Sequence, residues 1–380
     1  TTSQTGSLLG SGLGMTTTAT VTQFATVEAA IGEDASITVS TATTGTVLVD
    51  AKATNIANAD VQGGVGAVII SVGIMSATSS VGGSTTARMD GDIVSAYSVD
   101  VLAVSTNDAD AKVDGVSVGL IGGGLGSTAS ATVAATAKTN ALVGSTPAMT
   151  PSMTTVIQGV LVSAQSTNTA DANTPGSVGS IVAAGQELNT TAIVAGGTKA
   201  LMDGVIGSAL WLTVQANGTN TATAQMLAQG GAVGGAGAGV TGYAEVASSA
   251  DVDAIVGEDA NITLTSGPTG VTVTATSVNT ANAPARTISG AVGITADTLD
   301  VIALVGGGTS AQMNGNIQSA VQLLVQANGT NTATASLLAQ GGSVLGSGAG
   351  LDSRAEITLA ADVNAVVGSN ASINLTTGPT

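Results

Sequence analysis

Apolar and polar residues alternate along many stretches of this chain with a period of two. In residues 271–275 (VTVTA) valine alternates with threonine, and residues 323–327 and 99–103 follow the same pattern less strictly. Such alternation is typical of β-strands with one buried face, since successive side chains point to opposite faces of a sheet. No stripe of apolar residues at helical spacing is sustained, because glycine and β-branched residues interrupt it. The pattern therefore predicts an all-β chain.

Segments of three kinds follow one another in a fixed order. Each alternating strand leads into a glycine-rich element, such as residues 63–66, 115–119 or 230–235, and then into a strand of small residues such as 130–134. Asp-Gly, Asn-Gly and Gly-Glu-Asp turns separate the strands, since these residues adopt turn conformations at low cost. This order predicts one structural unit that recurs along the chain.

The alternating strand returns throughout the sequence. Residues 214–224 (VQANGTNTATA) recur letter for letter at 325–335, an offset of 111 in the numbering. Looser copies keep an alanine and, four positions on, an asparagine. The asparagines of the six copies are Asn55, Asn107, Asn168, Asn220, Asn279 and Asn331. Their spacings of 52, 61, 52, 59 and 52 show two unlike half-units that alternate in a period of 111 to 113.

Independent landmarks support the period. A Met-(Asp/Asn)-Gly tripeptide ends at Gly91, Gly204 and Gly315, at offsets of 113 and 111. A second motif, (Ile/Val)-Gly-x-x-Ala-x-Ile, marks the other half-unit. Its copies are residues 31–37, 256–262 and 367–373, with a degraded copy at 143–147. Internal periods of this kind indicate a solenoid, in which each repeat packs on the next.

We therefore expect an elongated parallel β-solenoid (β-helix), continuous over residues 1–380. The approximate periods are 1–112, 113–225, 226–336 and a partial one at 337–380. Pro379 and Thr380 match Pro268 and Thr269, so the chain stops in mid-repeat, and we expect the natural array to be longer. Successive coils would pair through their backbones at about 4.8 Å. A half-unit can hold two coils of roughly 26 to 30 residues or a single larger coil, and the sequence leaves both open.

Composition narrows the class of protein. Charged residues make up 8% and aromatic residues 1%, too few large side chains for an ordinary globular core. With 43% hydrophobic residues and only six prolines, the chain is nevertheless too apolar to be disordered. Small and β-branched residues suit thin structures in which sheets approach closely. A net charge of −17 argues against a nucleic-acid partner, because no basic stripe exists to neutralise phosphates.

Catalytic and membrane-spanning functions find little support. The chain has no histidine and no cysteine, which excludes a Ser-His triad, a thiol nucleophile and a conventional zinc site. We expect no enzyme activity and no cofactor. The longest apolar run, residues 65–77, is shorter than the roughly 20 residues of a transmembrane helix. Residues 237–242 match a dinucleotide-binding fingerprint, but no helix is predicted after them to receive a pyrophosphate.

The recurring asparagines are the most prominent candidate residues. We interpret them as structural, either at a bend or in an amide ladder along the solenoid, in preference to a ligand-binding array. Asp108, Asp110, Asp251 and Asp253 are weak candidates for Ca²⁺ ligands, since carboxylates in turns bind this ion, but solvated turn acids are the favoured interpretation. The threonine columns beside the asparagines are too mixed for an ice-binding lattice, and Trp211 is an isolated variation.

The alternation of these strands, the glycine-rich segments and the (Ile/Val)-Gly-x-x-Ala-x-Ile turns resembles large repetitive bacterial surface proteins. These are the filamentous-haemagglutinin-like and leukotoxin-like filamentous adhesins, and the resemblance covers essentially the whole chain. It implies a secreted parallel β-helix that serves as a stalk, adhesin or matrix fibre, with no catalytic residues to carry over.

We therefore expect a structural, non-enzymatic subunit or segment of an extracellular bacterial filament, sheath or biofilm-matrix fibre. Self-association into fibres or lateral bundles is the expected interaction, with cell-surface glycans and other matrix proteins as further partners. One alternative is the monomeric stalk of a giant surface adhesin whose binding domain lies outside this segment. A carbohydrate-active β-helix enzyme is a third alternative, because acid pairs alone can serve a glycosidase.

Overall fold

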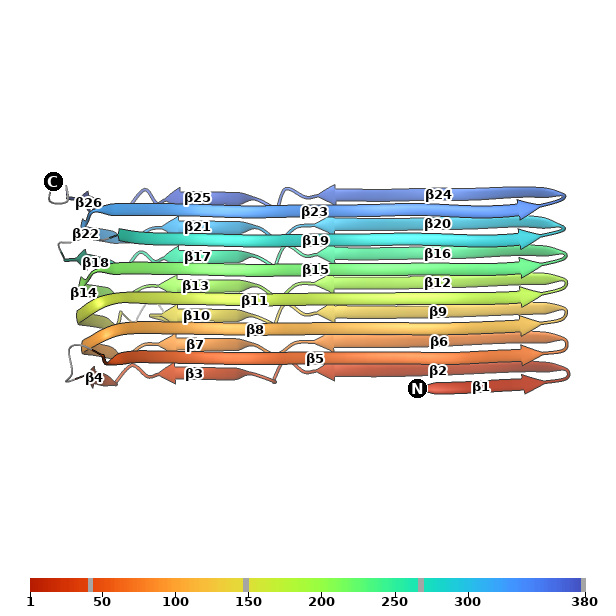
Figure 1. The fold of residues 1–380 in the computed structure, drawn as a ribbon, viewed down its shortest axis with the longest axis horizontal. Helices are drawn as coiled ribbons and strands as arrows, with labels where there is room; N and C mark the ends of the chain where they lie inside the picture. Colours follow the sequence, from red (N-terminus) through yellow and green to blue (C-terminus); the bar gives the residue numbers. More distant parts are fainter. Residues whose placement is uncertain (40–43, 146–149, 266–269, 377–380) are drawn as a thin grey trace.

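The chain is an all-β, elongated parallel β-solenoid (Figure 1). The computed structural model describes residues 1–39, 44–145, 150–265 and 270–376, which contain twenty-six strands and no helix. The matches predicted at Pro268, Thr269, Pro379 and Thr380, and the last two residues of the degraded motif at 143–147, lie outside these ranges. Every strand pair in the described residues is parallel, so the chain winds in one direction throughout.

Sheet A contains the long strands, four of which have 22 residues. The short first strand β1 (Thr2–Ser7) precedes the long strands, which are β5 (Thr46–Ala67), β8 (Asp92–Gly119), β11 (Ser152–Ser180), β15 (Trp211–Ala232), β19 (Gly270–Ala291) and β23 (Gln322–Ser343). Short strands at one edge complete sheet A. They are β4 (Ser36–Thr38), β14 (Val205–Ala209), β18 (Asn261–Leu264), β22 (Asn316–Ala320) and β26 (Ile373–Leu375). In β8 and β11 this short segment is continuous with the long strand, with a register shift in the β11–β8 pairing between Val156 and Gly159.

Two smaller sheets face sheet A. Sheet B is formed by seven strands of equal length: β2 (Gly10–Val21), β6 (Ile70–Val81), β9 (Gly122–Val133), β12 (Ala183–Val194), β16 (Gly235–Val246), β20 (Ile294–Val305) and β24 (Gly346–Ile357). Sheet C is formed by seven shorter strands: β3 (Val27–Ile31), β7 (Thr85–Met89), β10 (Thr139–Val143), β13 (Thr198–Met202), β17 (Val252–Val256), β21 (Thr309–Met313) and β25 (Val363–Val367). Each coil therefore runs along sheet A and returns through sheets B and C.

The register shows that each half-unit is one large coil. Asn168 of β11 pairs with Asn107 of β8 on one side and with Asn220 of β15 on the other. Asn55, Asn279 and Asn331 continue the same column. Of the two coil sizes that the sequence left open, the larger is present, so 52 to 61 residues advance the solenoid by one strand spacing of about 4.8 Å.

The turns between sheets B and C account for two residues of the difference in length between the two half-units, and the connection from sheet C back to the long strands accounts for the rest. Three residues connect β6 to β7 and β12 to β13, whereas five connect β9 to β10 and β16 to β17. The connection between the long strand and the sheet B strand always has two residues. Strand lengths and register are therefore kept while the turns at the other end of sheet B vary.

The glycine-rich segments are not separate elements, which corrects the predicted unit. Residues 63–66 lie inside β5, and residues 115–119 lie inside β8. A Cβ atom on Gly63 would lie 2.6 Å from the sulfur of Met75, and one on Gly115 would lie 2.1 Å from its terminal methyl carbon. Glycine is used there because the side chain of the facing strand β6 fills the space.

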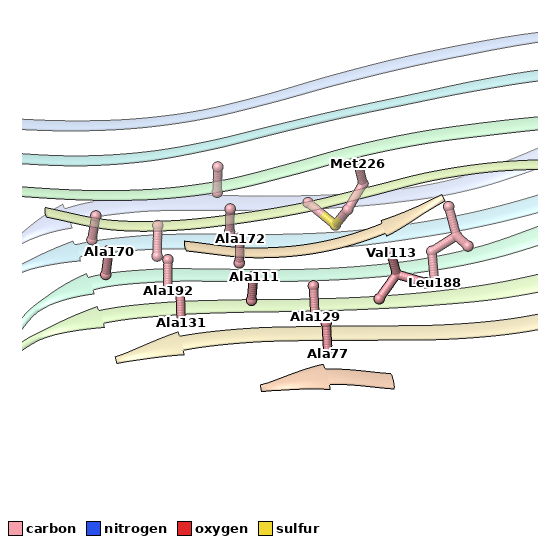
Figure 2. Packing of buried hydrophobic residues seen from close by; sticks show 14 of the residues in the cluster. Ala77, Ala111, Val113, Ala129, Ala131, Ala170, Ala172, Leu188, Ala192 and Met226 are labelled. Carbon is pink, nitrogen blue, oxygen red and sulfur yellow. The ribbon is translucent and has the colours of Figure 1, made fainter. Parts of the chain in front are cut away.

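The interior is thin and is filled mainly by alanine and valine. Figure 2 shows Ala111 and Ala172 of sheet A together with Ala129 and Ala131 of sheet B. Where a side chain of sheet A is large, the residue that faces it in sheet B is small. Met226 lies against Gly242, where a Cβ would approach it to 2.1 Å, while the preceding coil has a bond of 2.5 Å between the hydroxyls of Thr174 and Thr190 at the same level.

The segment is broader along its strands than along the solenoid axis (Figure 1). A strand of the common length in sheet A extends about 73 Å, while seven coils stack to roughly 30 Å. The described residues thus form a flat two-layered slab, and the chain reverses at its two short edges, where the strands end. None of them forms a helix that is long and apolar enough to cross a membrane.

Candidate functional site

The six asparagines form a continuous amide ladder inside the solenoid. The Nδ2 of each donates to the Oδ1 of the next, from Asn55 to Asn331, at 2.8 Å for the first three bonds and 2.9 Å for the last two. The four central asparagines are at most 1% exposed. They lie in the middle of long strands and not at a bend, so of the two structural interpretations the ladder matches the geometry.

Four of the ladder amides also bind the backbone of the facing layer. Nδ2 of Asn168 donates to the carbonyl of Gly196 at 3.2 Å, and Nδ2 of Asn279 donates to that of Gly307 at 3.0 Å. Asn220 and Asn331 do the same to Ala250 and Ala361 at 3.3 Å. These carbonyls lie in the turns between sheets B and C, where the facing layer is interrupted. The ladder therefore satisfies backbone groups that would otherwise be buried without a partner.

Hydroxyl pairs continue the polar seam beside the ladder. Ser105 bonds to Thr139 and Ser277 to Thr309, each at 2.5 Å, and Ser166 bonds to Thr198 in the same way. The seam divides the interior into two apolar clusters, one under sheet B and one under sheet C. These buried bonds fix the register between coils, and they occupy the amide groups that a ligand would otherwise bind.

Asp108 and Asp110 lie on the outward face of β8, beside Asp171 of β11, which is the register partner of Asp110. Desolvation, followed by repulsion from Asp108 and Asp60, raises the pKa of Asp110. The register partners of Asp108 in the next two coils are Thr169 and Thr221, so the acidic position is not repeated. Within the described part of the chain, no three His, Cys, Asp or Glu residues are arranged to hold a metal ion.

Asp251 and Asp253 interact with residues of neighbouring coils. Asp251 accepts the backbone N–H of Gly308 in the next coil at 2.7 Å. Burial raises the pKa of Asp253 to about 6, repulsion from Asp251 adds to this, and Lys199 of the neighbouring strand lowers it. Asp251 thus connects successive coils and is not merely a solvated turn acid.

Sequence reasoning missed other acids that connect coils. Asp90 is 4% exposed, accepts the N–H of Ser145 at 2.7 Å and pairs with Arg88, which also contacts Glu28 at 3.1 Å. Asp203 accepts the N–H of Asp259 at 3.0 Å. Both belong to the Met-Asp-Gly tripeptides, so the recurrence of that landmark was the available signal.

The remaining candidates from the sequence are not surrounded by groups that could form a site. Residues 237–242 lie within the extended strand β16. Trp211 lies over Gly159, where a Cβ would come within 2.3 Å of the indole. An open hollow of about 630 Å³ on the outer face of sheet B is lined by Glu187, Asp300 and Asp352, but by no aromatic side chain that could stack on a sugar ring.

A row of exposed aliphatic residues follows one of the two short edges of the slab, where the strands end. At this edge, where the arrowheads of the long strands end in Figure 1, a two-residue arc connects sheet A to sheet B in each of the seven coils. The first residue of every arc is aliphatic and 47 to 76% exposed. These residues are Leu8, Val68, Leu120, Ile181, Val233, Val292 and Val344. We call this row, with the second residues of the arcs, the apolar edge.

The repeat thus preserves two kinds of feature, an interior ladder and an apolar edge, and neither has the geometry of a catalytic centre. The polar groups that recur from coil to coil in the described residues bond one coil to the next. Comparison with protein-family models, with curated proteins and with solved structures finds no match to this chain.

Proposed function

We propose that this chain is a structural, non-enzymatic segment of an extracellular bacterial filament, sheath or biofilm-matrix fibre. The observation that carries the proposal is the ladder: six coils repeat one inward-facing asparagine, and each amide bonds to the next. Buried chemistry that is repeated at every coil serves the pairing of coils, whereas a catalytic centre needs a local departure from the repeat. The resemblance to filamentous bacterial adhesins supports the same function and a location at the cell surface.

The outward face of sheet A carries no charge that is repeated from coil to coil beside the asparagines. The column of residues that follows the asparagines is Ile56, then Asp108, and then threonine in four successive coils, Thr169, Thr221, Thr280 and Thr332. Self-association is the interaction that a repeated, uncharged edge favours, with glycans and other matrix proteins as secondary partners.

Electron microscopy and sedimentation of the purified chain test the proposal. We expect particles that contain several molecules and grow with protein concentration. Particles that stay monomeric at millimolar concentration would instead support the second candidate, the monomeric stalk of a giant adhesin. The slab alone is compatible with that alternative, because a stalk needs the same coil-to-coil pairing but no lateral contact.

A carbohydrate-active enzyme is the third candidate, and its test is separate. Asp300 and Asp352 are register partners on the outer face of sheet B and line the open hollow described above. We expect no hydrolysis of soluble glycans by the chain. Hydrolysis that disappears in the Asp300→Asn variant and persists in Asp114→Asn would contradict a purely structural function.

A further inference from the structure

The apolar edge is unusual because tight turns at a protein surface are normally polar. Of its fourteen arc residues, twelve are aliphatic and two are glycine. No charged residue stands within three positions of any arc, in a chain whose net charge is −17. The turns at the opposite edge contain Asp90, Asp203, Glu258 and Asp259. Chain reversal alone does not require aliphatic residues, since the opposite edge reverses the chain with polar ones.

The edge is also rigid and periodic. Backbone bonds connect successive arcs: Ile181 N–H donates to the carbonyl of Leu120 at 2.9 Å, and Val233 N–H donates to that of Ile181 at 2.8 Å. Each arc therefore lies one strand spacing, about 4.8 Å, from the next. The aliphatic side chains form a straight row whose spacing is set by the backbone and not by side-chain packing.

From this geometry we propose that the apolar edge is the interface with a second copy of this chain, placed edge to edge. An identical row has the same spacing, so each arc of one copy meets an arc of the other along the whole edge. Two copies that each carry −17 repel least where neither has a charge. This inference rests on the proposed structural function and names the surface through which two copies pair.

The area of the edge is sufficient for a stable pair. Eleven of the arc side chains are aliphatic and exposed. Together they present on the order of 1,000 Å², against roughly 800 Å² per partner in a standard-sized interface. Exposed apolar patches beyond a few hundred Å² generally mark interaction surfaces. A two-fold axis then brings the fourth arc, with Ile181, against its own copy, whether the two solenoid axes run parallel or antiparallel.

Sedimentation of matched variants tests the interface. The double variant Leu120→Glu/Val233→Glu puts like charges on the edge, and we expect its dissociation constant to rise at least tenfold over that of the unmodified chain. The matched control, Ile56→Glu/Val278→Glu, adds the same charges at positions on the outer face of sheet A that are 53% and 41% exposed, and it should associate like the unmodified chain. A triple serine variant at Leu120, Ile181 and Val233 provides the same test without added charge.

Cross-linking locates the contact, because the chain has no cysteine of its own. Under oxidation we expect Ile181→Cys to form a disulfide-linked dimer and Ile56→Cys to remain uncross-linked. Association that persists in both edge variants would overturn the interface while leaving the self-assembling function intact. An unmodified chain that stays monomeric at every concentration would contradict both. A monomeric chain whose edge binds phosphatidylcholine vesicles would likewise overturn the interface, in favour of a lipid surface.

Discussion

The inward and outward faces of the long strands follow different rules. The inward column at the ladder is asparagine in all six coils, and the inward column two residues on is alanine in all six, from Ala57 to Ala333. The outward column between them is isoleucine and aspartate in the first two coils and threonine in the last four. Neighbouring residues of the same strand thus experience different constraints.

The difference has a physical origin. An inward side chain must fit the fixed gap between sheet A and the facing layer, and any polar atom it carries must find a partner there. An outward side chain meets water, which accepts many shapes and charges. The apolar edge is an outward feature that nevertheless recurs in every coil. This recurrence indicates that the surface has a function.

Replacing a ladder residue gives the largest expected effect on stability. Asn220→Ala removes the donor to Asn279 Oδ1 and to the carbonyl of Ala250, which leaves two buried acceptors unpaired. We expect the free energy of unfolding to fall by about 3 kcal/mol. Denaturant titration measures the loss, and Asn217→Ala, on the outward face of the same strand, is the control with a change within about 0.5 kcal/mol. Equal losses in both variants would contradict the distinction between the faces.

A methyl group added between coils should have the next largest effect. A Cβ on Gly91 would lie 2.6 Å from the carbonyl oxygen of Gly32 and 2.8 Å from that of Ala35. Since neither backbone can move without disturbing the coil, Gly91→Ala should cost about 2 kcal/mol. Gly290→Ala has no atom within 4 Å and serves as the control, with a neutral or slightly favourable change. A harmless Gly91→Ala would show that coils are not in such close contact.

The outward acids should make stability depend on pH. Asp253 has a pKa raised from 3.8 to about 6, mainly by burial, so between these values the folded chain binds more protons than the unfolded one. The contribution of Asp253 to stability therefore decreases as the pH rises from about 4 to 6. Thermal unfolding at pH 4 and pH 7 measures it. Asp253→Asn should weaken this decrease, whereas Lys199→Met should strengthen it, because Lys199 lowers the pKa of Asp253. If the loss of stability between pH 4 and pH 7 were the same in both variants as in the unmodified chain, Asp253 would not be its source.

Substitution at the apolar edge should have the smallest effect on the fold itself. Val233→Ser changes a side chain that is 51% exposed, and we expect a change in unfolding free energy within about 0.5 kcal/mol when the chain is measured as a monomer. Unfolding at low protein concentration checks this. A loss comparable to that of Asn220→Ala would mean that the edge belongs to the interior packing, which would remove its availability for a partner.

Much of the architecture could be predicted from the sequence, because the repeat is visible there. The recurrence of Asn55 and its five counterparts predicted a β-solenoid, and the structure has that fold. The size of the coil could not be predicted, since the spacing between Asn55 and Asn107 fits one turn or two. The sequence pattern assigns Gly63 and Gly115 to a separate glycine-rich element, but they make room for Met75 inside continuous strands.

The features that the sequence did not reveal depend on neighbours in space. Asp90 is ordinary in its Asp-Gly turn until the next coil brings the N–H of Ser145 to it. The arc at Val68 lies inside the apolar run of residues 65–77, and only the fold shows that it reverses the chain at an exposed edge. The pairing register between strands brings residues that are far apart in the sequence into one column, and this register could not be derived from the sequence alone.

A distance between two spin labels tests the central claim, that one coil contains a whole half-unit, most directly. Thr54→Cys and Thr330→Cys place labels on exposed residues of one outward column, five coils apart. Pulsed electron paramagnetic resonance should then give a separation of about 24 Å, five strand spacings. A separation of about 48 Å, as two coils per half-unit would require, would contradict this architecture.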